Sequence, residues 1–152
     1  MKVISFFGSS SSGKTNIIEN VIKTLSSEYK IMYIKGIPHE NISLDTENKD
    51  TWRMENAGAY ITYGLTPSRT YKMTREKSYI DDIMDENSDI VIIESFKSYK
   101  NAIKFLVIGD EEYIKNYEYN YIIRANNETY NGECIKYPVE FNKIIKIISG
   151  AV

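Results

Sequence analysis

The sequence predicts an α/β domain in which a doubly wound, mostly parallel sheet is flanked by helices. A short β-prone run at residues 3–7 leads into a glycine- and serine-rich loop, which leads into an amphipathic helix. Strand-like and helix-like segments then alternate along the chain, an order typical of parallel sheets covered on both faces. Residues 89–94 form an apolar, β-branched run without alternation, which indicates a strand buried on both faces.

The first predicted helix covers residues 15–25, where apolar side chains recur at the three- and four-residue spacing of one helical face. These side chains are Ile17, Ile18, Val21, Ile22 and Leu25. Residues 30–35 are predicted to form the second strand, and residues 36–50 a long polar loop. A loop of that length inside a compact domain is usually either functional or disordered.

The middle of the chain is predicted to insert a β-hairpin into this plan. Residues 51–58 indicate a short helix that ends at Gly58. Residues 59–63 and 69–73 flank a turn at residues 64–68 and predict either a hairpin or a pair of edge strands.

The second half of the chain is predicted to return to alternating elements. A helix is expected at residues 78–86, directly before the buried strand. The remaining predicted elements are a strand at 102–108, a helix at 111–117, a strand at 120–125 and a closing helix at 138–148 with Ile144, Ile145 and Ile148 turned inward. In a sheet of this kind the ligand is expected at the carboxyl ends of the strands.

Length and composition favour a single domain that spans residues 1–152. The net charge of −2 gives no basic field for nucleic acid or an anionic membrane, so neither is expected as a partner. The single cysteine, Cys134, excludes an internal disulfide and fits a reducing compartment. No apolar run approaches the ~18 residues of a membrane span, and no leader-like segment precedes the first strand. We therefore expect a cytoplasmic protein.

The loop after the first strand fits the phosphate-binding template G-x-x-x-x-G-K-[ST] at every required position. Its glycines allow the backbone N–H groups to curl around a phosphate at the start of the helix. Lys14 is expected to reach the β- and γ-phosphates, and the Thr15 hydroxyl is placed to ligate Mg²⁺. The predicted nucleotide-binding residues here are Gly8, Ser9, Ser10, Ser11, Ser12, Gly13, Lys14, Thr15 and Asn16.

The chain resembles the family of molybdopterin-guanine dinucleotide biosynthesis protein B (MobB), which are small P-loop GTP-binding proteins. The match covers most of residues 1–127. It rests on the loop 8–15, Tyr33-Ile34-Lys35, Asp45, Lys49-Asp50-Thr51, Ala57-Gly58-Ala59, residues 92–97 and the strand at 102–108. The resemblance implies a P-loop NTPase-type fold, GTP as ligand with Mg²⁺ as cofactor, and slow GTP hydrolysis. It also implies a homodimer that assists the nucleotidyltransferase MobA in attaching GMP to molybdopterin. The hairpin strands near residues 59–73 could pair across that dimer or could equally be covered internally.

Three departures from the family pattern bear on function. Lys35 is followed by residues 36–39, Gly-Ile-Pro-His, where the family places histidines directly after the lysine. The family's Glu-Gly-Phe-Lys is Glu-Ser-Phe-Lys at residues 94–97. Its Ala-Ser-Asp is Ala-Asn-Asn at residues 125–127, so that Asn127 stands where the resemblance places the guanine reader. An amide satisfies only one of the two guanine donors, and we therefore expect only a modest preference for GTP over ATP, unless backbone groups near Ala125 and Asn126 read the base.

Two acids and a lysine complete the predicted site. Glu94 ends the buried strand on the ligand side, where an acid holds Mg²⁺ or orients the attacking water; the alternative is a solvated carboxylate. The resemblance suggests Asp45 as a second acid on the magnesium side, although loop acids are commonly only solvated. Lys35 ends the second strand near the expected phosphate, or serves solubility. The catalytic candidates are Lys14 and Glu94; the metal-ligand candidates are Thr15, Asp45 and Glu94.

Two other functions compete with the GTP-binding accessory protein. A small-molecule P-loop kinase commonly clamps phosphate with an arginine-bearing lid, and this chain shows no arginine cluster. Its arginines are Arg53, Arg69, Arg75 and Arg124. A metal-delivery GTPase of the hydrogenase or urease type has a similar Glu-Ser after a buried strand. Metal delivery needs soft or imidazole ligands. The chain has one histidine, His39, and one cysteine, Cys134, which are too few unless a dimer shares them.

Overall fold

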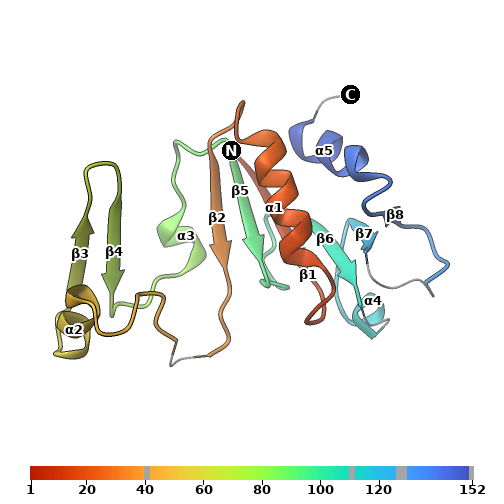
Figure 1. Ribbon diagram of the computed structural model, residues 1–152. Coiled ribbons are helices and arrows are strands. Elements are labelled where there is room, and N and C mark those ends of the chain that lie inside the picture. Colours follow the sequence, from red (N-terminus) through yellow and green to blue (C-terminus); the bar gives the residue numbers. More distant parts are fainter. Residues whose placement is uncertain (40–41, 110–111, 126–129, 151–152) are drawn as a thin grey trace. The chain divides into compact units, whose positions relative to one another are not determined.

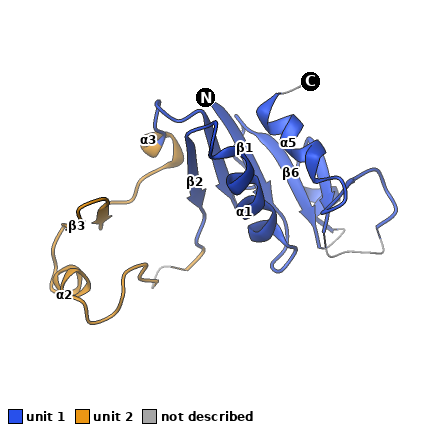
Figure 2. Cartoon of the chain, turned by 45° about the horizontal axis from the view of Figure 1, so that its top comes forward, with its two compact units in different colours: residues 1–37, 84–152 blue, residues 38–83 orange. Residues whose placement is uncertain are grey.

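The computed structural model describes residues 1–39, 42–109, 112–125 and 130–150 (Figure 1). The chain divides into two compact units, coloured blue and orange in Figure 2. The first unit comprises residues 1–37 and 84–152, and the second comprises residues 38–83. That residues 1–152 act as one domain stays a prediction.

The first unit contains a six-stranded sheet with the strand order β2-β5-β1-β6-β7-β8, and every pair of neighbours is parallel. The strands are β1 (Lys2–Phe7), β2 (Ile31–Lys35), β5 (Ile90–Glu94), β6 (Ile103–Ile108), β7 (Tyr121–Arg124) and β8 (Ile135–Lys136). The chain leaves β1 toward β2 and β5, then crosses to β6 on the other side of β1. This arrangement confirms the predicted doubly wound sheet and puts the switch point at the carboxyl end of β1.

Helices cover both faces of this sheet. Helices α1 (Lys14–Leu25) and α5 (Phe141–Ser149) lie together on one face, and α4 (Glu112–Asn116) packs on the other (Figure 1). The apolar stripe predicted for α1 is confirmed, since the helix buries Ile17, Ile18, Val21 and Leu25.

Successive side chains of the sheet supply two separate cores because side chains alternate between faces along a strand. Phe6 faces α1 and α5 and stacks on Phe105 at a centroid distance of 5.0 Å. Phe7 faces the α4 side, where its ring meets Tyr117 edge-on at 6.0 Å. All five residues of β5 are buried, as its unalternating sequence predicts. Each fully buried isoleucine or phenylalanine side chain contributes about 1.5–3 kcal/mol to the free energy of unfolding.

The second unit contains the predicted hairpin. Its elements are α2 (Asp50–Asn56), β3 (Ile61–Leu65), β4 (Thr70–Thr74) and α3 (Ile80–Ile83). The strands are antiparallel, but they begin later than predicted. Gly64 lies within β3, opposite Tyr71, and not in the turn.

The helix predicted at residues 78–86 is shorter than expected, because α3 covers only four residues. Aspartate side chains bind backbone N–H groups locally and so compete with the helix. Asp82, within α3, accepts from the Tyr79 N–H at 3.0 Å and so caps the start of this short helix. Asp85 accepts from the Asn87 N–H at 3.0 Å, which closes a turn where the prediction continues the helix.

The last strand of the sheet, β8, was not predicted from the sequence. β8 has two residues, too few for any periodicity to be recognised. The closing helix begins at Phe141 and not at residue 138. A turn precedes it, in which Glu140 N–H donates to the Lys136 carbonyl at 2.7 Å.

Candidate nucleotide-binding site

The glycine- and serine-rich loop joins the carboxyl end of β1 to the first turn of α1, where a phosphate-binding loop must lie. Gly8 has φ +147°, and a Cβ there would stand 2.1 Å from the Val107 carbonyl oxygen of β6. Gly13, at the start of α1, has φ +95°. Because L side chains rarely adopt these conformations, the two fixed glycines of the template are required by the backbone itself.

Lys14 is almost completely buried inside this loop. Its Nζ donates to the carbonyls of Gly8 (3.2 Å) and Ser9 (2.5 Å) and to Ser12 Oγ (3.3 Å). Burial lowers the pKa of Lys14 below its ordinary value of 10.5; the Glu94 carboxylate opposes this, and the nearby cations add to it. The ammonium therefore sits among neutral oxygens, as a cation suited to an anionic ligand.

Glu94 lies beside the loop because three strands end at the same level. Phe6 of β1 and Lys35 of β2 both lie in register with Glu94 of β5. The side chain is 3% exposed. Its Oε1 accepts from Thr15 Oγ1 at 3.1 Å and lies 3.8 Å from Lys35 Nζ. The structure thus brings together three of the predicted site residues from three separate elements.

The second carboxylate oxygen of Glu94 has a partner that the sequence did not reveal. The Tyr33 hydroxyl of β2 donates to Glu94 Oε2 at 2.5 Å. Burial and this hydrogen bond raise the pKa of Tyr33 above its ordinary range. Both oxygens of the carboxylate are consequently held in place by hydroxyl groups.

The Thr15 hydroxyl and the Glu94 carboxylate have the chemistry of a Mg²⁺ site. Both are hard oxygen donors, and they already lie within hydrogen-bond distance of each other. Across the described residues, no three His, Cys, Asp or Glu side chains form a cluster able to hold a metal. Mg²⁺ commonly takes one or two protein ligands and completes its shell with phosphates and water, and these two residues fit that pattern.

Lys97, three residues after Glu94, is a third cation near the loop. Its Nζ lies 4.6 Å from the centroid of the Tyr113 ring and 4.7 Å from that of Tyr117. It donates to both hydroxyls at 3.3 Å, and the contact with Tyr113 raises the pKa of Lys97. No ion pair joins Lys97 to a carboxylate in the part of the chain that the structure describes. Tyr113 of α4 and Tyr117, which directly follows the helix, therefore hold this cation without neutralising it.

The residue after Glu94 is strained. Ser95 has φ +75°, a left-handed conformation that costs a non-glycine residue about 1–2 kcal/mol. Its backbone N–H donates to the Phe6 carbonyl at 3.0 Å, which ties this turn to β1. The glycine that the family shows at this position would adopt the conformation freely.

We expect Ser95→Gly to stabilise the protein by about 1 kcal/mol, because the strain removed exceeds the added entropy of the unfolded chain. Urea unfolding of the purified variant measures this difference. Ser98→Gly, in the same loop, is the matched control because Ser98 has no positive φ; it should be neutral or destabilising. A loss of stability in Ser95→Gly would contradict the assigned strain.

The remaining predicted residues are placed as follows. Residues Ser11 to Asn16 line a cavity of about 240 Å³. Asp45 belongs to the second unit, where its carboxylate accepts from the Thr51 hydroxyl at 2.7 Å, and its magnesium role stays a prediction. Asn127 lies outside the described residues. Sequence reasoning missed Tyr137, whose hydroxyl donates to Asn16 Oδ1 at 2.7 Å across 121 positions.

Other features bear on the competing functions. The Arg53 guanidinium lies 3.6 Å from Asp50, and Arg75 and Arg124 donate to backbone carbonyls. These local contacts give no support to an arginine-bearing kinase lid. His39 and Cys134 belong to different units. None of the described helices has the length and apolarity needed to cross a membrane.

A parallel sheet, a glycine-rich loop at its switch point and a buried lysine in that loop define the class of P-loop nucleotide-binding proteins. Within this class, the family model of Molybdopterin guanine dinucleotide synthesis protein B matches residues 3–119. The chain therefore belongs to the MobB family.

Curated relatives and solved structures agree with this family. A Methanocaldococcus jannaschii protein, provisionally named a molybdopterin-guanine dinucleotide biosynthesis adapter protein, is 36% identical over 118 residues, 74% of this chain and 49% of the relative. The adapter protein of that name from Haemophilus influenzae is 30% identical over 101 residues, 62% of this chain and 57% of the relative. The chain thus spans about half the length of the curated relatives it matches.

The fold is also that of solved MobB proteins. The crystal structure of Bacillus subtilis MobB superposes with a TM-score of 0.80 at 20% identity and covers 99% of both chains. A MobB homologue from Bacillus stearothermophilus gives a TM-score of 0.67 at 16% identity, with coverage of 99% and 94%. At these identities the likeness establishes the fold alone, and it confirms the predicted fold class.

Proposed function

We propose that this chain binds GTP with Mg²⁺ and serves as an accessory protein in forming molybdopterin guanine dinucleotide. The names of its relatives support the pathway, since both are described as adapter proteins of this biosynthesis. The proposal includes a nucleotidyltransferase of the MobA type, which attaches GMP to molybdopterin, as the partner that it assists.

The observation that carries the nucleotide site is the pairing of Thr15 with Glu94 beside a buried Lys14. The Lys14 ammonium would exchange the Gly8 and Ser9 carbonyls for phosphate oxygens, and Lys35 would add a second positive charge. Mg²⁺, when bound, would neutralise phosphate charge between Thr15 and Glu94. The backbone N–H groups at the start of α1 favour the same anion.

The geometry around Glu94 supports slow hydrolysis. Each carboxylate oxygen already accepts a hydroxyl hydrogen, from Thr15 and from Tyr33. These contacts occupy both carboxylate oxygens, so one of them would have to be released before Glu94 could accept a hydrogen bond from an attacking water in that position. Binding and presenting the nucleotide therefore fits this site better than rapid turnover.

The hairpin of the second unit supports a homodimer. Ile61, Tyr63 and Leu65 alternate along β3 and so share one face of the hairpin, and all three are exposed. An exposed row of large apolar side chains on a two-stranded ribbon is typical of a surface that pairs with another protein. We propose a second copy of this chain as that partner.

Isothermal titration calorimetry with GTP and ATP, each with and without Mg²⁺, tests the nucleotide assignment. We expect one site per chain for GTP, with affinity at least about tenfold weaker without Mg²⁺, since the metal offsets phosphate charge held near Glu94. ATP should bind more weakly by a modest factor. Absence of GTP binding by the folded protein in both conditions would contradict the proposal.

A further inference from the structure

Tyr137 brings the end of the chain to the phosphate-binding loop. It directly follows β8, and its backbone N–H donates to the Arg124 carbonyl at 2.9 Å, so that it extends the sheet by one step at the carboxyl edge of β7. Its ring packs edge-on against Phe141 of α5 at 5.8 Å. The residue lies beyond residues 3–119, the part that matches the family model.

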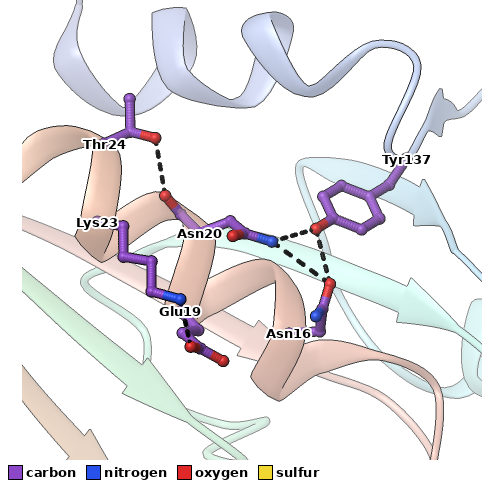
Figure 3. Close-up of polar contacts among 6 residues, drawn as sticks. All are labelled: Asn16, Glu19, Asn20, Lys23, Thr24 and Tyr137. Carbon is purple, nitrogen blue, oxygen red and sulfur yellow. Dashed lines mark hydrogen bonds and ion pairs between the residues drawn. The ribbon is translucent and has the colours of Figure 1, made fainter.

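The Tyr137 hydroxyl stands in a chain of hydrogen bonds with a defined direction (Figure 3). Asn20 Nδ2 donates to the hydroxyl oxygen at 2.6 Å, and the hydroxyl donates to Asn16 Oδ1 at 2.7 Å. Asn20 Nδ2 also lies 3.5 Å from Asn16 Oδ1. The two asparagines are four residues apart on α1, which puts them on the same face of the helix.

This direction fixes the orientation of the Asn16 amide. Its oxygen is occupied by the Tyr137 hydroxyl and by Asn20, which leaves the NH₂ group on the other side. That NH₂ group donates to no residue in the described part of the chain. Asn16 also lines the cavity at the phosphate-binding loop. The Asn16 amide is thus held by its oxygen. Its NH₂ group remains able to donate to a ligand in the cavity at the phosphate-binding loop.

The position of Asn16 indicates which part of the ligand it meets. Thr15 contacts Glu94 at the end of β5, whereas Asn16 contacts Tyr137 next to β7. In the sheet, β5 lies on one side of β1, and β6, β7 and β8 follow on the other. A nucleotide whose terminal phosphates lie near Lys14 and Thr15 therefore extends its nucleoside end toward the Asn16 side.

We propose that Tyr137 is a positioning residue that, together with Asn20, holds the Asn16 amide so that its NH₂ group binds the α-phosphate of a nucleotide. This inference rests on the nucleotide site proposed above and deepens it. The inference gives the last segment of the chain a role in selecting nucleotides over inorganic phosphate compounds. Pyrophosphate has no nucleoside end that extends toward Asn16.

Calorimetric titration of Tyr137→Phe and Asn16→Ala with GTP and with pyrophosphate tests the inference. Loss of one hydrogen bond to a charged group should weaken GTP binding about 10- to 150-fold in each variant. Pyrophosphate affinity should stay unchanged, and the double variant should lose no more than Asn16→Ala alone. Tyr121→Phe is the matched control, because the Tyr121 ring also packs against a phenylalanine, Phe105, at 5.2 Å, while its hydroxyl donates to none of the described residues.

The outcomes separate this inference from the proposed function. If the wild-type protein binds GTP and Tyr137→Phe binds it equally well, the inference is wrong and the nucleotide site stands. Equal losses for GTP and pyrophosphate would show that Tyr137 only supports the loop, and would also overturn it. If the wild type binds neither ligand, the proposed function is wrong, and the inference that rests on it is wrong as well. Should Tyr137→Phe not fold, Asn16→Asp decides, since its negative charge should weaken GTP more than pyrophosphate.

Discussion

Lys14→Ala is expected to reduce the affinity for GTP by at least about 100-fold, because two charge-assisted hydrogen bonds to phosphate are lost at about 1.5–3 kcal/mol each. The fold should persist. In the free protein Lys14 contacts only neutral oxygens of the loop, and its burial disfavours the charged form. Removing it therefore eliminates a desolvated cation together with its hydrogen bonds. Calorimetry and thermal unfolding measure the two effects.

Lys14→Arg is the matched variant for this prediction. It keeps the charge, but the planar guanidinium does not fit the space where the ammonium contacts Gly8, Ser9 and Ser12. We expect it to lose most of the affinity as well. A folded Lys14→Ala protein that binds GTP as tightly as the wild type would show that the loop does not hold the phosphates.

Glu94→Gln is expected to lower Mg²⁺-dependent GTP turnover about 100-fold, the usual effect of removing one group that stabilises charge in the transition state. The amide keeps the shape of the side chain and can still accept from Tyr33 or Thr15. It loses the negative charge that faces the metal and Lys35. GTP affinity without Mg²⁺ should therefore change much less. Single-turnover hydrolysis and calorimetry in chelator measure the two quantities.

The control for Glu94→Gln is Glu118→Gln, because Glu118 is almost fully exposed and lies 4.0 Å from Lys104, away from the loop. That variant should hydrolyse GTP at the wild-type rate. If Glu94→Gln also turns over at the wild-type rate, Glu94 is only a buried structural acid. The nucleotide site would then act purely by binding.

The parts of the fold that were predicted from the sequence are those fixed by local patterns. The template at residues 8–15 specifies a strand, a loop and a helix together, and the run at residues 89–94 needs no partner to be recognised as a buried strand. Glu94 was expected beside the loop because strand ends share one edge of a parallel sheet, and it lies there.

The parts that could not be predicted depend on contacts between distant residues. Tyr33 meets Glu94 across 61 positions, and Tyr137 meets Asn16 across 121 positions. Of the tyrosines around Lys97, Tyr113 lies on the short helix α4 and Tyr117 directly follows it; nothing in the local pattern there points toward the loop after β5. Such partners follow from strand order and register, which single-sequence periodicity does not supply.

A crystal structure of the protein with Mg²⁺ and a non-hydrolysable GTP analogue tests the nucleotide site most directly. We predict that the Lys14 ammonium leaves the Gly8 and Ser9 carbonyls for the β- and γ-phosphates, and that Mg²⁺ lies between the Thr15 hydroxyl and the Glu94 carboxylate. A nucleotide bound elsewhere, with Lys14 still hydrogen-bonded to the carbonyls of its own loop, would contradict the assignment.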